Sequence, residues 1–418
     1  MNEPLDGNTG TQQPGTGMTR RQALKVGGAA VAGMTIAGYH SPQVHATEKK
    51  IRIGVVGGGF GAQFPWHEHP NCEVTAVSDL RPERLAGLRD RYQCDNTYKS
   101  LEELVKDKNV DAVAVFTEGT MHVPHALEAF KHGKHVISAV PACYATLEEA
   151  EMLLEGVEST GLTYMMAETS YFQQFTISAR KFAEAGDFGT IFYAESEYQH
   201  DGLDALFFEN GKPTWRHGLP PMYYPTHCTA HMVGVTGERL TEVVCHGWGD
   251  DSPLLKGNAH NNPFWNQSAM FKTELGHGFR VNIWWHGAHR GAERAQWIGD
   301  KMSFYAPHAN GLGPILIHGA REEETDDAGF VRHAQQMEAY KQPHWWATDM
   351  LPESLRSDSG HDGSHNFLVH EFIDSLINER RPAVNIYEAL NYTVPGLIAH
   401  QSSLRDGELL KIPLFTAK

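Results

Sequence analysis

A glycine-rich run directly after a short apolar stretch constrains this chain more than any other feature. Gly57-Gly58-Gly59-Phe60-Gly61-Ala62 follows the β-branched run from Ile51 to Val56 and has the spacing G-x-G-x-x-A. In such a unit Gly57 permits a tight turn, Gly59 lets the backbone approach a pyrophosphate, and Ala62 lets helix and strand pack closely. We expect a helix to begin at this loop with its N-terminus toward the phosphates.

An acidic residue stands where the ribose of a dinucleotide needs one. Asp79 ends the second apolar run, 20 residues after Gly59 (79 − 59), where its carboxylate accepts hydrogen bonds from both ribose hydroxyls. Its charge repels a 2′-phosphate, which favours NAD over NADP. Arg81 leaves NADP open, because a nearby arginine accommodates that phosphate.

The periodicity of the chain changes near residue 170. From Ile51 to Glu168, β-branched runs alternate with helical patterns, which is typical of βαβ units. We predict strands at 51–56, 73–78, 111–116, 135–138 and 162–167, and helices at 82–92, 101–107, 123–131 and 147–155. Later strand-like runs at 191–198, 268–273 and 279–285 indicate a second sheet. We expect 306–358 to be irregular, and helices at 365–378 and 387–403.

The expected fold is therefore α/β. It comprises an N-terminal Rossmann doubly wound parallel sheet in residues 47–170, and a C-terminal α/β domain with a large, mostly antiparallel open sheet in residues 171–418. The two C-terminal helices are expected to return toward the Rossmann domain.

The first 46 residues have the features of an export signal. A lead of 18 residues rich in Gly, Thr, Gln and Pro, expected to be disordered, precedes Arg20-Arg21, a weakly apolar run and Val44-His45-Ala46, a small-x-small cleavage pattern. This is typical of a twin-arginine signal peptide, and the run is too short and weakly apolar for a membrane anchor. We expect a periplasmic or secreted protein, exported already folded.

Charge and metal-ligand patterns exclude other classes. The net charge of −16 argues against a nucleic-acid or anionic-membrane partner, since both need clustered cations. The five cysteines have no CxxC spacing, and the 25 histidines include no HExxH motif, so we expect neither a disulfide framework nor a metal site.

Two further motifs resemble the Gfo/Idh/MocA oxidoreductase family. They are Phe116-Thr117-Glu118-Gly119-Thr120-Met121-His122, in which Thr117 and His122 match and Glu118-Gly119 depart, and Gly133-Lys134-His135-Val136. The resemblance covers nearly all of residues 50–415. It implies a Rossmann domain, a second α/β domain with an open sheet, and assembly into homo-oligomers through that sheet.

One departure concerns proton transfer. Where that family usually has Glu-Lys-Pro, this chain has Ala139-Val140-Pro141, and Val140 cannot donate or accept a proton. Either another residue has the role of the lysine, or the substrate is not oxidised in the usual way.

The second half is similar to the NAD-dependent glycosidases of glycoside hydrolase family 109. The matching motifs are Tyr198-Gln199-His200-Asp201, Trp215-Arg216, Tyr224-Pro225-Thr226-His227 and Gly360-His361-Asp362-Gly363. The similarity implies a carbohydrate substrate bound by Tyr198, Arg216, Tyr224 and His227, with transient hydride transfer at sugar C3, elimination and addition of water. The alternatives are a sugar oxidoreductase or epimerase with resident NAD(P), and a non-catalytic sugar-binding relative.

Side-chain chemistry suggests roles within this set. We expect His227 to accept the proton of a sugar hydroxyl, because Val140 leaves that role vacant; the alternative is a buried histidine that satisfies a carbonyl. Tyr224 acts as an acid or base only if Arg216 lowers its pKa, and otherwise both bind substrate.

The expected dinucleotide pocket is formed by residues that follow the predicted strands of the first sheet. Glu168 is expected to line it rather than act chemically, and for His122 the alternative is to cap the following helix. The pocket residues are Gly57, Gly59, Phe60, Gly61, Ala62, Asp79, Thr117, His122, Val140 and Glu168. Because no large nicotinamide pool exists outside the cytoplasm, export favours a bound NAD that is reduced and reoxidised within each cycle.

Overall fold

A six-stranded parallel sheet is built from the first third of the chain. The computed structural model describes residues 49–200, 202–288, 292–308, 311–319, 323–333 and 336–417. The strand order is β3-β2-β1-β4-β5-β6, so the chain order reverses between β1 and β4, where doubly wound sheets bind dinucleotides. The strands are β1 (Ile51–Val56), β2 (Cys72–Ser78), β3 (Thr97–Tyr98), β4 (Ala112–Val115), β5 (His135–Ser138) and β6 (Tyr164–Met166). The predicted Rossmann sheet is confirmed.

The helices between these strands follow their capping signals. They are α2 (Pro82–Tyr92), α3 (Leu101–Leu104), α4 (His122–Lys131) and α5 (Leu147–Thr160). Pro82 opens α2 at a position whose N–H would have no partner. The Thr146 side chain accepts a hydrogen bond from the Glu149 amide at the start of α5, and Gly161 ends that helix in the left-handed region.

The prediction that a helix begins at the glycine loop is wrong. Phe60–Gln63 (η2) and Trp66–Glu68 (η3) are separate 3-10 turns. Pro65 lies between them, and a proline has no backbone N–H and clashes with the carbonyl four residues earlier in an α-helix. Any phosphate at this loop is therefore held by loop amides and side chains, without a long helix behind them.

A nine-stranded, mostly antiparallel sheet forms the second layer, as predicted. Its order is β18-β15-β14-β13-β7-β12-β11-β10-β19, and only the β7–β12 pair among its described strands is parallel. The strands are β7 (Ile191–Gln199), β10 (Leu240–Trp248), β11 (Asn266–Thr273), β12 (Gly278–Trp284), β13 (Ala292–Gly299), β14 (Met302–Tyr305), β15 (Ile315–His318), β18 (Gln336–Ala339) and β19 (Leu410–Lys411).

The segment from 306 to 358 was expected to be irregular, and this is wrong in part. It supplies β15 and β18 to the edge of the large sheet, and β16 (Glu323–Thr325) pairs with β17 (Val331–His333). The apolar run of β15 was a strand signal that was overlooked, whereas β18 is polar and is ordered by its pairing at the sheet edge. A second small hairpin, β8 (Phe208–Glu209) with β9 (Lys212–Pro213), also stands outside the large sheet.

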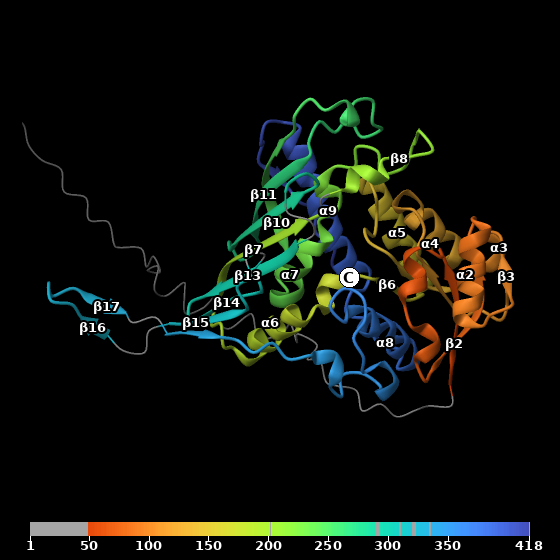
Figure 1. Cartoon of the computed structure of the whole chain (residues 1–418), viewed down its shortest axis with the longest axis horizontal. Helices are drawn as coiled ribbons and strands as arrows, with labels where there is room; N and C mark the ends of the chain where they lie inside the picture. Colours follow the sequence, from red (N-terminus) through yellow and green to blue (C-terminus); the bar gives the residue numbers. More distant parts are fainter. Residues whose placement is uncertain are drawn as a thin grey trace, which may run out of the picture. The chain divides into compact units, whose positions relative to one another are not determined.

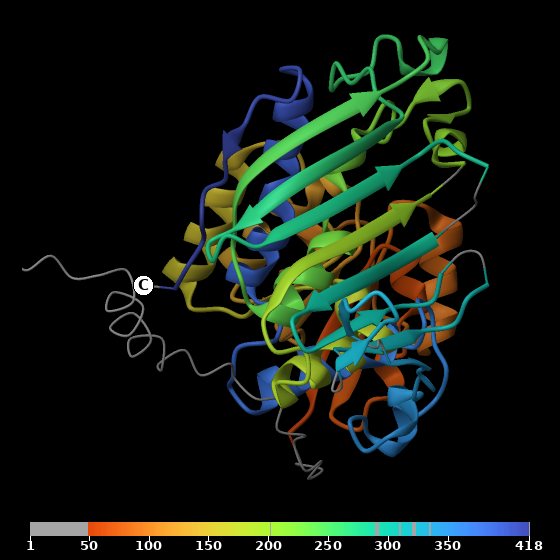
Figure 2. The same cartoon turned by 90° about the vertical axis from the view of Figure 1, so that its left-hand side faces the viewer.

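Four α-helices of the described part of the chain follow the first sheet in sequence, and the last but one contacts β1 rather than the second sheet (Figures 1 and 2). They are α6 (Gln174–Ala185), α7 (Thr226–Thr236), α8 (Ser364–Ile377) and α9 (Ile386–Ser403). Helix α7 contacts β7, β12 and β13, whereas α9 contacts β10 and β11 on one side and α5 and β6 on the other. The side chains of α7 are almost all buried, so this helix places its histidines in the interior.

The predicted export signal and the absence of a membrane anchor both concern the N-terminal segment. The expected signal peptide lies outside the described residues. Within residues 49–417, no described helix has the length and apolar character to cross a bilayer.

Candidate active site

The glycine loop forms a cradle that larger residues would fill. Gly57 has φ +100°, its amide donates to the Ser78 carbonyl at 2.9 Å, and a Cβ there would lie 2.2 Å from the carbonyl oxygen of Phe116. A Cβ on Gly61 would lie 2.9 Å from the Phe116 ring. The close approach predicted for Ala62 is therefore made at Gly61.

Asp79 presents a fixed carboxylate beside this cradle. Its Oδ2 accepts from the Gly58 amide at 2.6 Å and its Oδ1 from the Arg81 amide at 2.7 Å. Each oxygen keeps lone pairs for a ribose hydroxyl. Arg84, which was not among the predicted residues, lies at the same loop: its Nη1 would be 3.4 Å from a Cβ on Gly59. A guanidinium here suits a pyrophosphate, so these residues fit a dinucleotide.

Arg81 is occupied by a carboxylate from the second half of the chain. Its Nη1 and Nη2 donate to Oε1 and Oε2 of Glu209 at 2.8 and 2.7 Å. Glu209 lies on β8, and its charge stands where a 2′-phosphate would seek the arginine. The NADP alternative is thereby weakened.

His122, Thr117 and Val140 belong to the loops beyond β4 and β5. The His122 ring lies 2.7 Å from the Pro141 carbonyl and 3.3 Å from the Thr117 carbonyl, so it ties the two loops together. Its side chain does not cap α4. The Thr117 hydroxyl lies 2.9 Å from His125 Nδ1. The hydrogen bond of His122 to the Pro141 carbonyl fixes the backbone next to Val140.

A buried ion pair lies at the centre of the site. Glu168 follows the end of β6, and its Oε1 accepts a hydrogen bond from the Ser170 amide at 2.8 Å. The same oxygen lies 2.9 Å from Nδ1 of His227 on α7. The Ser170 hydroxyl lies at the same distance from that nitrogen.

Charge attraction overcomes burial in this pair. Burial alone would raise the pKa of Glu168, but the charge and hydrogen bond of His227 lower the pKa to about 2. Burial would lower the pKa of His227, but Glu168 raises it to about 9. Before ligands bind, His227 is therefore an imidazolium at neutral pH, and Glu168 is its counter-ion rather than a passive pocket wall.

The tyrosines implied by the resemblance gather at His227. The Tyr198 ring stacks on His227 with centroids 4.6 Å apart, and the Tyr224 ring lies 5.4 Å from it. Neither hydroxyl has a hydrogen-bond partner among the described residues. Burial raises the pKa of Tyr224 although Arg216 opposes this, so the phenol is protonated at neutral pH.

Arg216 completes the set as a cation without a carboxylate partner in the described part of the chain. Its guanidinium carbon lies 4.0 Å from the centroid of the Trp215 ring, and burial lowers its pKa. Trp215 packs on Gly119, where a Cβ would lie 2.9 Å from the indole. The Glu118-Gly119 departure thus makes room for the tryptophan.

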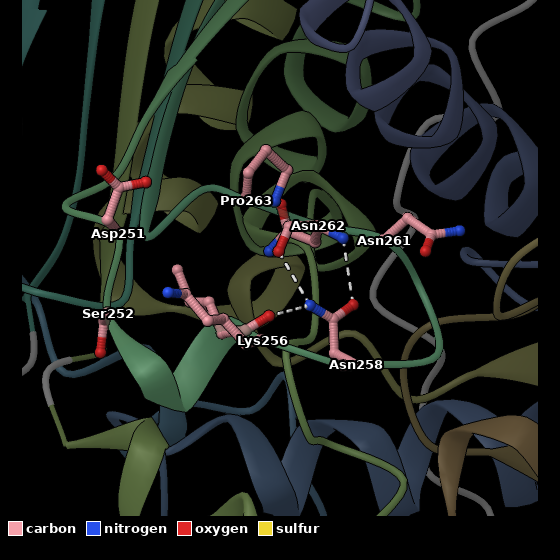
Figure 3. Close-up of a pocket in the computed structure, with 9 residues that line it drawn as sticks. Asp251, Ser252, Lys256, Asn258, Asn261, Asn262 and Pro263 are labelled. Atoms are coloured by element: carbon pink, nitrogen blue, oxygen red, sulfur yellow. Dashed lines mark hydrogen bonds between the residues drawn. The ribbon is translucent and has the colours of Figure 1, made fainter.

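The loop from Asp251 to Pro263 follows this turn in the chain, and Figure 3 shows its Asn258 side chain hydrogen-bonded to the Asn262 backbone. Asn258 donates to the Leu255 and Asn262 carbonyls at 2.6 and 2.9 Å, and Asn262 donates to the Gly218 carbonyl at 3.2 Å. A pocket of about 240 Å³ opens in the same loop. The candidate catalytic side chains do not line this pocket. The hydrogen bond from Asn262 to Gly218 connects the loop to the turn that contains Arg216.

The glycosidase-like Gly-His-Asp-Gly motif lies against the glycine loop. His361 Nδ1 is 2.9 Å from His365 Nε2, and the Phe60 ring is edge-on to both imidazoles. His361, Asp362 and Gly363 all have positive φ, a strained run of the kind found at functional sites. No cluster of three or more metal-ligating side chains occurs among the described residues.

Two ionisable residues near His227 were missed. His231 lies one helical turn after it on α7, and Glu293 lies on β13, where it pairs in register with Tyr198. Burial raises the pKa of Glu293 to about 7. The i, i+4 spacing of the histidines was a visible signal. A single Glu between Ala292 and Arg294 gave none.

Comparison with known proteins agrees with this geometry. Residues 51–168 match the oxidoreductase family GFO_IDH_MocA, NAD-binding Rossmann fold. A glycosyl hydrolase family 109 protein of Stenotrophomonas maltophilia is 24% identical, covering 96% of both chains. An alpha-N-acetylgalactosaminidase of Tannerella forsythia is 23% identical, covering 95% of this chain and 97% of its own.

The solved structures establish the fold. Scyllo-inositol dehydrogenase from Lactobacillus casei with bound NAD(H) and scyllo-inositol superposes with a TM-score of 0.63 at 15% identity, covering 87% of this chain and 99% of the other. The match over residues 51–168 agrees with the glycine cradle: this part of the chain is similar to the NAD-binding Rossmann domain of the Gfo/Idh/MocA oxidoreductase family.

Proposed function

We propose that the protein is an exported enzyme that cleaves a glycoside with a resident NAD, by transient oxidation at sugar C3, elimination and addition of water. The observation that carries the proposal is the buried Glu168–His227 pair under Tyr198 and Tyr224. The relatives named as family 109 hydrolases and as an alpha-N-acetylgalactosaminidase support a sugar substrate.

The residues of the first sheet hold the cofactor. Gly57 and Gly61 keep the loop close to β4, Asp79 binds the ribose hydroxyls, and Arg84 faces the phosphates. Bound there, NAD would supply a hydride acceptor that can be reduced and reoxidised within one cycle.

His227 manages the proton of the sugar hydroxyl. Its Nδ1 faces Glu168, which leaves Nε2 without a partner among the described residues and available to substrate. The imidazolium donates a hydrogen bond to a sugar oxygen. Once its Nε2 proton has passed to solvent water, the neutral ring accepts the hydroxyl proton at the same nitrogen. The Glu168 carboxylate accepts a hydrogen bond from the proton on Nδ1. It thereby favours the tautomer in which Nε2 is free to accept a proton.

Tyr224 and Arg216 act on the neighbouring positions of the sugar. The Tyr224 phenol is protonated at neutral pH and begins as a donor. It takes the C2 proton only after ionising, which the cation of Arg216 favours. Arg216 is otherwise a binding group, since a guanidinium keeps its charge.

The test combines a spectrum with turnover. The purified protein is expected to contain NAD by absorbance and to hydrolyse a nitrophenyl glycoside without added cofactor. His227→Gln should retain NAD and lose turnover. The matched control is His277→Gln, which breaks another His–Glu pair, 2.9 Å from Glu238, outside the site.

Other outcomes separate the alternatives. Accumulation of a keto-sugar instead of cleavage identifies a sugar oxidoreductase or epimerase. A protein that binds sugar but holds no dinucleotide is a non-catalytic relative, and that result contradicts the proposal.

A further inference from the structure

Two buried acceptor atoms face each other behind His227. Oε1 of Glu293 and Nε2 of His231 have no hydrogen-bond partner among the described residues, and they lie 3.6 Å apart. Both side chains are largely withdrawn from solvent. A buried polar atom without a partner is costly, so this arrangement calls for an explanation.

The hydrogen bonds of Ser196 identify the proton on His231. The Ser196 hydroxyl donates to the Arg294 carbonyl at 3.1 Å and lies 2.7 Å from Nδ1 of His231. A hydroxyl has one proton, and a carbonyl only accepts, so Ser196 accepts from an N–H at Nδ1. The neutral ring therefore presents a bare Nε2 to Glu293.

A carboxylate oxygen and a bare ring nitrogen repel each other unless a proton lies between them. We propose that Glu293 carries that proton toward His231, and that this buried neutral pair controls how tightly His227 holds its own proton. The inference deepens the proposed function, because it concerns the basicity of the same His227.

The surrounding charges favour the neutral pair. Glu168 already balances His227, and a second ionised carboxylate in the same interior would be unfavourable. The groups that act on Glu293 or His231 are His227, Glu168, Ser170, Gln173, Arg180 and, across the strand pair, Tyr198. When Glu293 ionises, the added negative charge stabilises the imidazolium of His227, and the two groups titrate as a coupled set.

Infrared spectroscopy tests where the proton is. Below pH 7 the protein without substrate should show the carbonyl stretch of a buried protonated carboxyl group, and Glu293→Gln should lose this band. Glu195→Gln is the matched control, because that carboxylate on β7 is paired with Arg280 at 2.6 Å and its removal should leave the band. Glu293→Asp should restore it.

A histidine titration tests the consequence. In Glu293→Gln the NMR titration midpoint of His227 should fall by about one pH unit, the effect of removing one nearby charge. A band that persists in Glu293→Gln, a cationic His231 at neutral pH, or an unchanged His227 midpoint overturns the inference. If Glu293→Gln does not fold, His231→Asn should shift the band instead. Neither measurement involves turnover, so its failure is distinct from failure of the proposed function.

Discussion

Glu168 and His227 are charged because of each other, and pH acts on the pair from two sides. The pKa of Glu168 is lowered to about 2, so its contribution to stability is present above its unfolded value of about 4.3 and is lost as pH falls through about 2. The pKa of His227 is raised to about 9, so its contribution is present below about 6.5 and is lost as pH rises through about 9.

We therefore predict a decline in the free energy of unfolding between about pH 6.5 and pH 9, because this pair loses its cation there. Urea unfolding at a series of pH values measures it. In Glu168→Gln the decline should disappear. The same slope in the variant and the wild type would contradict the assignment.

Gly57 is the residue of the cradle that tolerates change least. Gly57→Ala places a methyl group 2.2 Å from the Phe116 carbonyl in a backbone conformation that costs an L-residue about 1–2 kcal/mol. We predict a lower melting temperature and loss of bound NAD, measured by calorimetry and absorbance.

The control for this prediction is the same substitution on a neighbouring helix. Gly87→Ala lies in α2 with nothing within 4 Å of the added Cβ, and alanine is favoured there by roughly 0.5–1 kcal/mol. If Gly87→Ala lost NAD equally, the loss at Gly57 would not report on the cradle.

At the scale of elements, the β8–β9 hairpin supplies the counter-ion of Arg81. We predict that Glu209→Ala frees this arginine and strengthens NADP binding about tenfold, or ~1.4 kcal/mol, with little change for NAD. Titration calorimetry with both dinucleotides measures the ratio.

Two variants show whether the gain comes from Arg81. Adding Arg81→Ala to Glu209→Ala should remove the gain, and Asp204→Asn, which removes a carboxylate just before the hairpin, should leave the ratio unchanged. An equal gain in Asp204→Asn would mean that net charge alone is responsible.

Periodicity predicted those elements whose packing is regular. The bounds of β1, β5 and α2 are as predicted, because their apolar positions match one face of a sheet or helix. Pro65 was the overlooked signal against a helix at the glycine loop. Strand β18 was not predictable, since edge pairing rather than its own polar sequence orders it, whereas the apolar run of β15 was an overlooked strand signal.

The site divides in the same way. The motif residues Tyr198, Tyr224 and His227 come together as the resemblance implied. Glu168 reaches His227 only because α7 packs beside the end of β6, and Glu293 is placed by the register of its strand. Local sequence patterns do not predict either of these contacts.

For the whole molecule, the proposed export has a direct test. Arg20→Lys combined with Arg21→Lys should retain the protein in the cytoplasm with NAD bound, because the signal is altered and the cofactor site is not. Cell fractionation and absorbance of each fraction measure this. An exported double variant, or an exported wild type without NAD, would contradict the proposal.

The position of Glu168 also limits how this protein can be recombined. The residue that gives His227 its charge follows the last strand of the first sheet, although His227 itself lies on α7 among the residues proposed to bind the substrate. Replacing residues 51–168 with a Rossmann unit whose last strand is not followed by this acid would therefore keep a dinucleotide site and still remove the counter-ion of the proposed catalytic base. A chimera that combines the first sheet of one protein with the second sheet of another must therefore keep the residues just after β6 together with the second sheet.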